Sequence, residues 1–255
     1  MKRSAFCLLL FTQILAVCAP AGGDTKAPDG GSWEMWSYRE GVQHFKAGDF
    51  SKAWLCFDDL AGKQVSPGLL HNLGNAEFRL GSVGSAILAW ERAGALDPSL
   101  RNTSANLRFA RGQAGLNPPD LAWHESYSAW LSPDAWTWIA ALCFWGALAF
   151  LALPSLLRTR RSVWTQAGAV LTIALFILTL PALAGLWSRN RLGVVVADEA
   201  LLRLSPTQEG EVLGKLPPGE LARVELSRGG YHYVRAENDR AGWVTTEEFT
   251  RIWQR

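Results

Sequence analysis

The stretch that decides the fold runs from residue 135 to residue 187 and contains two long apolar segments. AWTWIAALCFWGALAFLALPSLL (residues 135–157) and VWTQAGAVLTIALFILTLPALAGLW (residues 163–187) carry no charged side chain. An α-helix rises about 1.5 Å per residue, so each segment is long enough to cross a hydrocarbon layer about 30 Å thick. A soluble helix of this length normally has a polar face, which neither segment has. The sequence therefore predicts two transmembrane helices, with a buried hairpin in a soluble core as the alternative.

The residues around these segments predict which side of the membrane they face. The connection at residues 158–161 holds three arginines and no acidic residue, whereas no Lys or Arg occurs in residues 112–157. Because Lys and Arg favour the cytoplasmic side, the connection is predicted to be cytoplasmic. Arg189 and Arg191 favour the opposite orientation weakly. Tryptophans near the segment ends fit membrane interfaces: Trp136, Trp138, Trp164 and Trp187.

The N-terminus has the pattern of a secretory signal peptide over residues 1–21. A basic start and a short apolar stretch precede residues 19–21 (Ala-Pro-Ala), the small-x-small pattern of a cleavage site. A lipoprotein-type site at Cys18 is the alternative, although Val17 is large for the position before that cysteine. Export of the N-terminus, together with the basic connection, predicts that both soluble parts lie outside the cytoplasmic membrane.

Composition excludes several function classes. The 255 residues are 49% hydrophobic and 19% charged, with a formal net charge of +2. A near-neutral chain lacks the basic face that neutralises phosphates, so no nucleic-acid partner is expected. High apolar content excludes a mainly disordered chain.

Residues 33–115 contain a repeat with a period of 33 residues. Matched positions are small or aromatic: Gly41 and Gly74, Gly48 and Gly81, Ala53 and Ala86, Phe57 and Trp90. The period and residue types resemble the tetratricopeptide repeat, a helix–turn–helix unit. Small residues would let paired helices approach closely, with the aromatic filling the space between neighbours. A fifth helix over residues 100–114 is expected to cover the exposed end.

The resemblance to tetratricopeptide repeats implies a peptide-binding concave surface lined by the first helix of each repeat. Mapping the pattern places five residues on that surface: Lys46, His71, Asn75, Phe78 and Arg79. Cationic side chains beside an amide can hold a partner's backbone or carboxylate. The alternative for each residue is an ordinary solvated position on a helix.

From residue 192 onward, short β-type runs alternate with turn residues such as those at 217–219 and 228–230. Residues 192–255 resemble a bacterial SH3-like domain in the order of their motifs, which are residues 200–206, 213–220, 230–234 and 242–244. Related domains bind cell-wall peptides, so Tyr231 and Trp243 are candidates for lining a ligand groove. Packing inside a small core is the alternative for both aromatic side chains.

No arrangement of residues in the sequence indicates catalysis. The four histidines have no metal-ligand spacing, and HExxH, CxxC, a nucleophile elbow and a phosphate loop are lacking. We therefore expect no enzyme activity, no metal site and no cofactor. Glu77 and the pair at 58–59 are interpreted as solvated helix faces, and residues 124–125 as part of an interfacial helix.

The predicted fold class is a multi-domain membrane protein with an all-α tetratricopeptide-repeat domain, a transmembrane helical hairpin and a small all-β SH3-like barrel. This order resembles BatE-type proteins of the bacterial Bat aerotolerance operon. The resemblance implies an inner-membrane scaffold, with two spans in the lipid bilayer and two periplasmic domains. Its expected partners are other membrane proteins, some with von Willebrand A domains. The alternative is an envelope protein that binds peptidoglycan or wall enzymes through its SH3-like domain.

Overall fold

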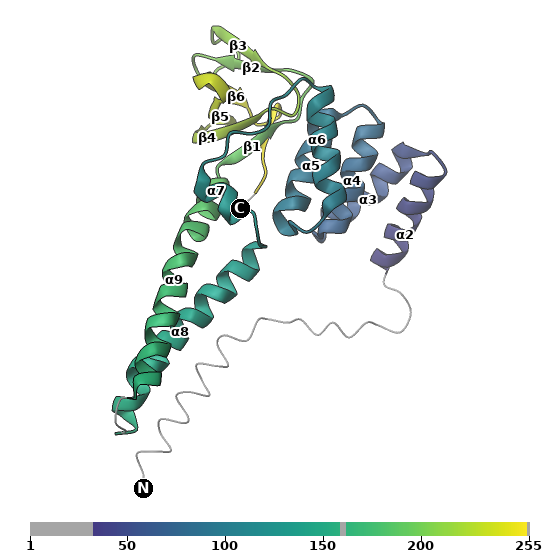
Figure 1. Ribbon diagram of the computed structural model, residues 1–255. Coiled ribbons are helices and arrows are strands. Elements are labelled where there is room, and N and C mark those ends of the chain that lie inside the picture. The colour runs from purple at the N-terminus through teal and green to yellow at the C-terminus, as the bar shows by residue number, and fades with distance from the viewer. Residues whose placement is uncertain (1–32, 159–161, 254–255) are drawn as a thin grey trace. The chain divides into compact units, whose positions relative to one another are not determined.

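The computed structural model describes residues 33–158 and 162–253 (Figure 1). The signal peptide predicted at residues 1–21 and most of the basic connection lie outside the described residues. The chain divides between Trp36 and Ser37, and Ser37–Arg255 is the second unit. The second unit contains the helices and strands that position the candidate site.

Residues 33–113 form the helices α2 (Trp33–Lys46), α3 (Phe50–Ala61), α4 (Pro67–Arg79), α5 (Val83–Leu96) and α6 (Arg101–Gln113). Ser66 caps α4 by accepting a hydrogen bond from the Leu69 N–H, and Pro67 occupies the first turn. The turns before α3 and α5 contain Gly48 and Gly81, whose φ angles are 83° and 88°. Glycine adopts this left-handed conformation without the strain of a Cβ atom.

The packing between helices recurs with the 33-residue period of the sequence. A Cβ atom on Gly41 would lie 2.7 Å from the Phe57 ring, and one on Gly74 would lie 2.7 Å from the Trp90 ring. Phe57 and Trp90 are both buried. The small residue of one helix thus makes room for the aromatic residue of the next at equivalent places in both helix pairs.

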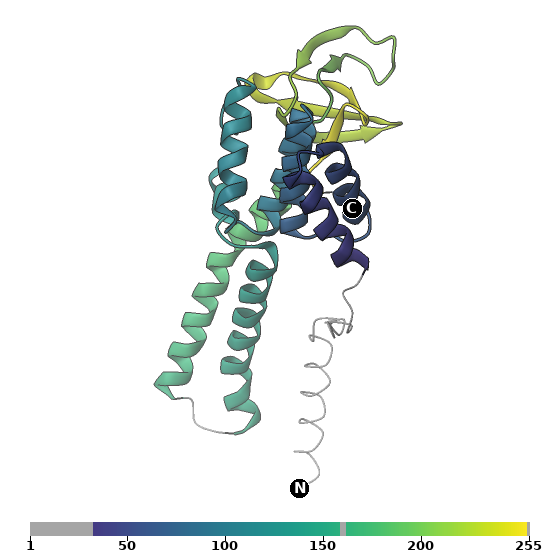
Figure 2. The same ribbon diagram turned by 90° about the vertical axis from the view of Figure 1, so that its right-hand side faces the viewer.

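Helices α8 (Pro133–Leu156) and α9 (Val163–Arg189) are long and apolar enough to cross a membrane, with mean hydropathies of 2.0 and 2.4. They pack along each other as a hairpin (Figure 2). Large apolar side chains point outward along both helices; Leu142 is 68% exposed and Val170 is 67% exposed. A hairpin in a soluble core would bury such side chains, so their exposure favours an apolar surrounding.

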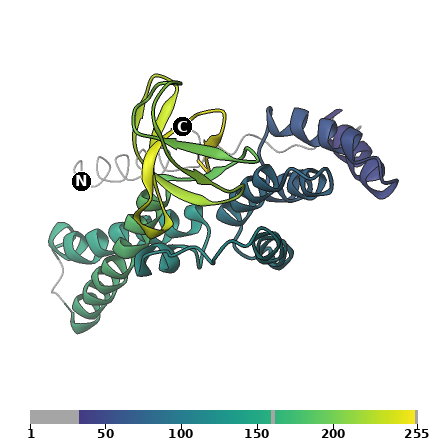
Figure 3. The same cartoon turned by 90° about the horizontal axis from the view of Figure 1, so that it is seen from above.

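Seven strands form one antiparallel sheet in the order β3-β2-β6-β5-β4-β1-β7 (Figure 3). Their bounds are β1 Leu192–Val195, β2 Ala200–Arg203, β3 Val212–Leu216, β4 Leu221–Arg228, β5 Tyr231–Ala236, β6 Ala241–Thr245 and β7 Phe249–Arg251. Leu216 of edge strand β3 and Phe249 of edge strand β7 belong to the same buried cluster. The sheet must therefore curve around one core.

The sheet packs directly against α5. One buried cluster combines residues of α5 and α6 with residues of β1 and the C-terminal segment: Ala86, Ile87, Leu88, Trp90, Ala110, Leu192, Val194 and Ile252. Arg92 of α5 donates hydrogen bonds to the carbonyl oxygens of Ile252 (2.9 Å) and Arg251 (3.0 Å). A Cβ atom on Gly84 would lie 2.4 Å from the Val195 carbonyl oxygen. Helices α2 to α6, called the helical segment below, thus share a core with the sheet through α5 and α6.

The short helix α7 (Trp123–Ser128) joins the hairpin to the sheet through a buried carboxylate. The Glu125 carboxylate accepts hydrogen bonds from Arg223 of β4 at 2.7 Å, from the Ala122 N–H at 3.0 Å and from the Ser188 hydroxyl of α9. Arg223 also donates to the Ser188 hydroxyl at 2.8 Å. Three elements that are distant in the sequence therefore meet at one charged side chain.

Hydrogen bonds keep the closely packed Glu125 carboxylate ionised at this point. A Cβ atom on Gly185 of α9 would lie 2.1 Å from the His124 carbonyl oxygen, so the two helices are in direct backbone contact. Burial disfavours the charged form of Glu125, but hydrogen bonds from Ser188, Arg223 and Ala122 outweigh it and lower the pKa. The resulting stabilisation is present above the ordinary value of 4.5 and is lost as the pH falls through the lowered pKa.

Replacing Arg223 with alanine is expected to destabilise the protein by about 3–5 kcal/mol, because the Glu125 carboxylate stays buried without its cation. Thermal unfolding of the purified full-length protein in detergent measures this loss. Arg235→Ala is the matched control, since its ion pair with Glu225 at 2.7 Å is largely exposed and is worth at most about 1 kcal/mol. Adding Glu125→Gln to Arg223→Ala should recover part of the loss. Equal melting temperatures for the Arg223 and Arg235 variants would contradict this assignment.

Candidate functional site

A pocket of about 200 Å³ opens between the helices of the helical segment. Its lining comes from four helices: Phe45 of α2, Asn75, Phe78 and Arg79 of α4, Trp90 of α5, and Asn106 and Phe109 of α6. Three of the five residues predicted for the concave surface are among them. The structure brings these together because residues 75, 78 and 79 lie on one face of α4.

Aromatic rings form most of the apolar wall. The ring of Phe78 lies 5.6 Å from that of Trp90 and 5.9 Å from that of Phe109, measured between centroids. Trp90 is buried and donates its indole N–H to the His71 carbonyl oxygen at 3.2 Å. Phe109 is 58% exposed, so an apolar ligand side chain would cover a ring that otherwise faces solvent.

Two amide side chains give the pocket a polar edge with both a donor and an acceptor. The Asn106 amide nitrogen donates to the Asn75 amide oxygen at 2.8 Å. This bond leaves the Asn75 NH₂ group and the Asn106 oxygen available to a ligand. A peptide backbone offers one C=O and one N–H per residue, which are the complementary groups.

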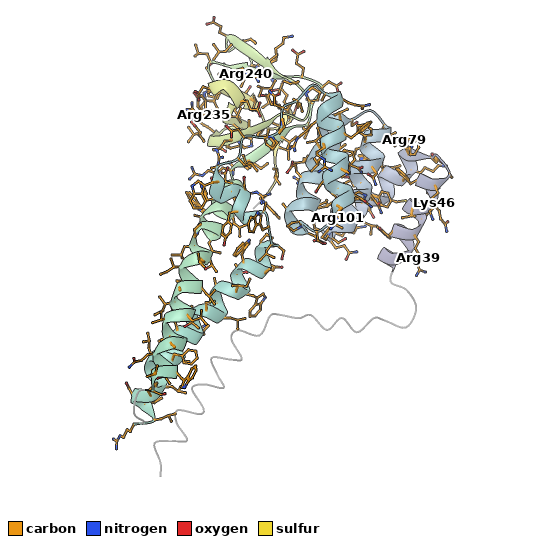
Figure 4. The ribbon with its side chains drawn as sticks, in the orientation of Figure 1. Arg39, Lys46, Arg79, Arg101, Arg235 and Arg240 are labelled. Atoms are coloured by element: carbon orange, nitrogen blue, oxygen red, sulfur yellow. The ribbon has the colours of Figure 1, made fainter. Side chains whose placement is uncertain are left out.

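Three of the residues predicted for the concave surface carry a cationic or titratable side chain, and each has different surroundings in the structure: Arg79, Lys46 and His71. The Arg79 guanidinium stacks over the Phe50 ring at 4.1 Å from its centroid, and Arg79 also lines the pocket. Figure 4 labels Arg79 and Lys46. Lys46 is exposed in the last turn of α2 and lies outside the pocket lining. His71 also lies outside the lining; its Nδ1 is 2.8 Å from the Thr103 hydroxyl, and burial lowers its pKa. His71 therefore contacts α6.

The candidate aromatic residues of the sheet lie on its outer face. Tyr233 pairs with Trp243 across β5 and β6, and Tyr231 pairs with Thr245. The Tyr233 and Trp243 rings are 5.4 Å apart. Because side chains alternate along a strand, these half-buried residues face away from the core residues Val234 and Val244.

The interpretation of Glu77 as part of a solvated helix face is wrong. Its Oε2 atom is buried and has no hydrogen-bond partner among the described residues. Burial raises the pKa of Glu77 to about 7; a hydrogen bond from Trp54 and the charge of Arg92 oppose the rise, and Asp58 adds to it. The docking of α3 and α5 on α4 encloses this carboxyl group, and helix periodicity gives no signal of it.

The sequence did not identify Glu125, or the α6 residues Asn106 and Phe109, as parts of a site. The sequence indicated only that Glu125 lies in an interfacial helix. In the structure, Glu125 is fully buried and forms an ion pair with Arg223. Asn106 and Phe109 belong to a helix that was expected to cover the repeats, and the face that it turns to α4 has no sequence signature. Asn106 and Phe109 are three positions apart and so share one face of α6, but this spacing does not show that the face turns toward α4.

Glu77→Gln is expected to stabilise the protein increasingly as the pH rises from about 4.5 to about 7, where the gain levels off at about 3 kcal/mol. Between about pH 4.5 and about pH 7 the unfolded chain has released this proton while the folded protein still holds it, so wild-type stability is full below this range and falls across it. Thermal unfolding of variant and wild type across this range measures the difference. Glu209→Gln, in an exposed turn, is the matched control for the same substitution at the surface. A constant difference for Glu77→Gln would contradict the assignment.

Comparison with models of known protein families finds no match, and comparison with curated proteins finds no similar sequence. The chemistry of the lining residues is therefore the evidence for what the pocket binds. That lining combines an aromatic wall, an amide pair with a free donor and acceptor, and one stacked cation. These groups suit a peptide with an apolar side chain.

Proposed function

We propose that the protein is a non-catalytic membrane scaffold that captures a peptide segment of a partner in the pocket between α2, α4 and α6. The observation that carries this proposal is the pocket itself, with its exposed Phe109 ring beside the Asn75–Asn106 amide pair. The aromatic wall would take an apolar side chain, while the amides would bond the adjacent backbone. Arg79 would add attraction for an acidic residue or a carboxylate.

In this proposal, α2 to α6 are tetratricopeptide-type repeats and the sheet is an SH3-like barrel. The recurrence of Gly41 against Phe57 and of Gly74 against Trp90 supports the repeat assignment. The shared core of edge strands β3 and β7 supports a barrel, because only a strongly curved sheet brings its edges to one cluster.

The proposed location is the bacterial inner membrane, with both soluble parts in the periplasm. A hairpin of two membrane-spanning helices returns the chain to the side of the membrane from which it entered. The contacts of Glu125 and Arg223 with Ser188 support this arrangement, since they hold residues before and after the hairpin against the same end of α9. The predicted signal peptide and the basic connection assign that side to the periplasm.

The proposed partners are membrane proteins with von Willebrand A domains, as the resemblance to BatE-type proteins implies. The core shared by α5 and the sheet fixes the spacing between the helical pocket and the outer face of the sheet. Two weak contacts from one rigid unit at the membrane would add through effective concentration.

Phe109→Ala is expected to reduce partner capture at least 5-fold, because an exposed ring of the pocket wall is lost without loss of a core side chain. The measurement is cross-linked affinity capture of the full-length protein from native membranes, quantified by mass spectrometry for proteins with von Willebrand A domains. Leu55→Ala is the matched control, since Leu55 is 59% exposed on α3 and lies outside the pocket. Equal capture by both variants would remove the pocket from the proposal.

The second candidate function is binding of peptidoglycan by the sheet, favoured by the outward-facing Tyr231, Tyr233 and Trp243. Aromatic side chains on an exposed strand face provide a stacking surface for a ligand. This function requires that the detergent-solubilised full-length protein co-sediments with purified cell wall, and that Trp243→Ala reduces co-sedimentation at least 5-fold. The full chain is needed because β1 shares its core with α5. Wild-type protein that stays in the supernatant would exclude this candidate.

A further inference from the structure

A second cleft, of about 340 Å³, lies where the helical segment, the sheet and the end of α9 meet. Its walls include Leu107 and Arg108 of α6, Arg189 of α9, Leu192 of β1, and Trp253 near the C-terminus. This cleft shares no lining residue with the pocket between α2, α4, α5 and α6, called the peptide pocket below. It is therefore a separate candidate for ligand binding.

The walls of this cleft are fixed by contacts on both sides. Arg92 of α5 holds the C-terminal segment through the carbonyl oxygens of Arg251 and Ile252. The Glu125–Arg223 ion pair holds β4 against α7, and both residues contact Ser188, one residue before Arg189. The cleft is thus preformed.

The charge of the cleft is positive and only partly neutralised. Three arginines and one glutamate line it, which gives a formal charge of +2. Glu91 pairs with Arg111, whereas Arg108 and Arg189 have no ion pair within residues 33–158 and 162–253. The remaining lining is largely apolar, with Leu107, Leu121, Leu192 and Leu221 among its residues. Two free cations beside apolar side chains suit an anionic amphiphile.

The position of the cleft places it beside the membrane boundary. Arg189 is the last residue of α9, and Ala129, which also lines the cleft, lies four residues before α8 begins. Trp187 is 60% exposed, and the guanidinium of Arg191 lies over its ring at 4.5 Å from the centroid. Exposed tryptophans beside arginines are typical of the headgroup level of a bilayer.

We propose that this cleft binds the headgroup of an anionic phospholipid, with Arg108 and Arg189 contacting the phosphate. The acyl chains of the lipid would extend along the apolar surface of the α8–α9 hairpin. The proposal rests on the membrane location in the proposed function but is independent of peptide capture. Helix α6 lines both the cleft and the peptide pocket. Binding of the lipid in the cleft would therefore fix the height of the peptide pocket above the bilayer.

The test is native mass spectrometry of the full-length protein in detergent, titrated with phosphatidylglycerol or with phosphatidylcholine of the same acyl chains. Wild-type protein should retain phosphatidylglycerol preferentially, and Arg108→Gln with Arg189→Gln should weaken this binding at least 10-fold. The matched control is Arg101→Gln with Arg228→Gln, which removes two exposed arginines outside the cleft (Figure 4 labels Arg101).

Three results would overturn the proposal. These are equal retention of the two lipids, equal losses in the two double variants, and binding of inorganic phosphate as tight as that of the lipid. Recovery of each variant in the membrane fraction is measured separately, because failure to insert would contradict the membrane location itself. Loss of lipid binding with partner capture unchanged would support the cleft and leave the peptide pocket in place.

Discussion

The ion pair between the buried Glu125 carboxylate and the partly exposed Arg223 is the interaction on which the arrangement of the second unit depends. A carboxylate removed from water is costly unless a cation and hydrogen bonds replace its hydration. At Glu125 these replacements come from β4, from the end of α9 and from the backbone before α7. Each of the three elements is therefore needed to satisfy the same charge. The close approach of Gly185 to the His124 carbonyl oxygen packs α9 directly against α7 at this junction.

The core shared by α5 and the sheet has a second consequence for function. Ile87 and Val194 are fully buried in one cluster although one lies on a helix and the other on a strand. Separating the two elements would expose both side chains, at a cost of roughly 1.5–3 kcal/mol each. The helical pocket, the outer face of the sheet and the cleft beside α9 consequently keep fixed positions with respect to one another. The proposed scaffold function would need this rigidity if several weak contacts are to act on one partner.

The candidate site was predictable only in part. The resemblance to tetratricopeptide repeats placed Asn75, Phe78 and Arg79 on the predicted concave surface, and all three line the pocket. The same mapping included Lys46 and His71, which lie outside it, because exposure and the contact with Thr103 depend on how α2 and α6 dock. Phe109 completes the pocket from α6. Its role depends on the rotation of a helix whose sequence does not specify which face turns inward.

Local sequence pattern was enough to predict the two apolar helices, the recurrence of small and aromatic residues every 33 positions, and the short strands separated by turns after residue 192. Hydropathy and periodicity act over a few turns of chain, so neighbouring residues suffice to predict them. Tertiary structure alone decided the burial of Glu77 and Glu125 and the packing of α5 on β1. These depend on groups far apart in the sequence, such as Glu125 and Arg223, and desolvation of a charge is set by everything that encloses it.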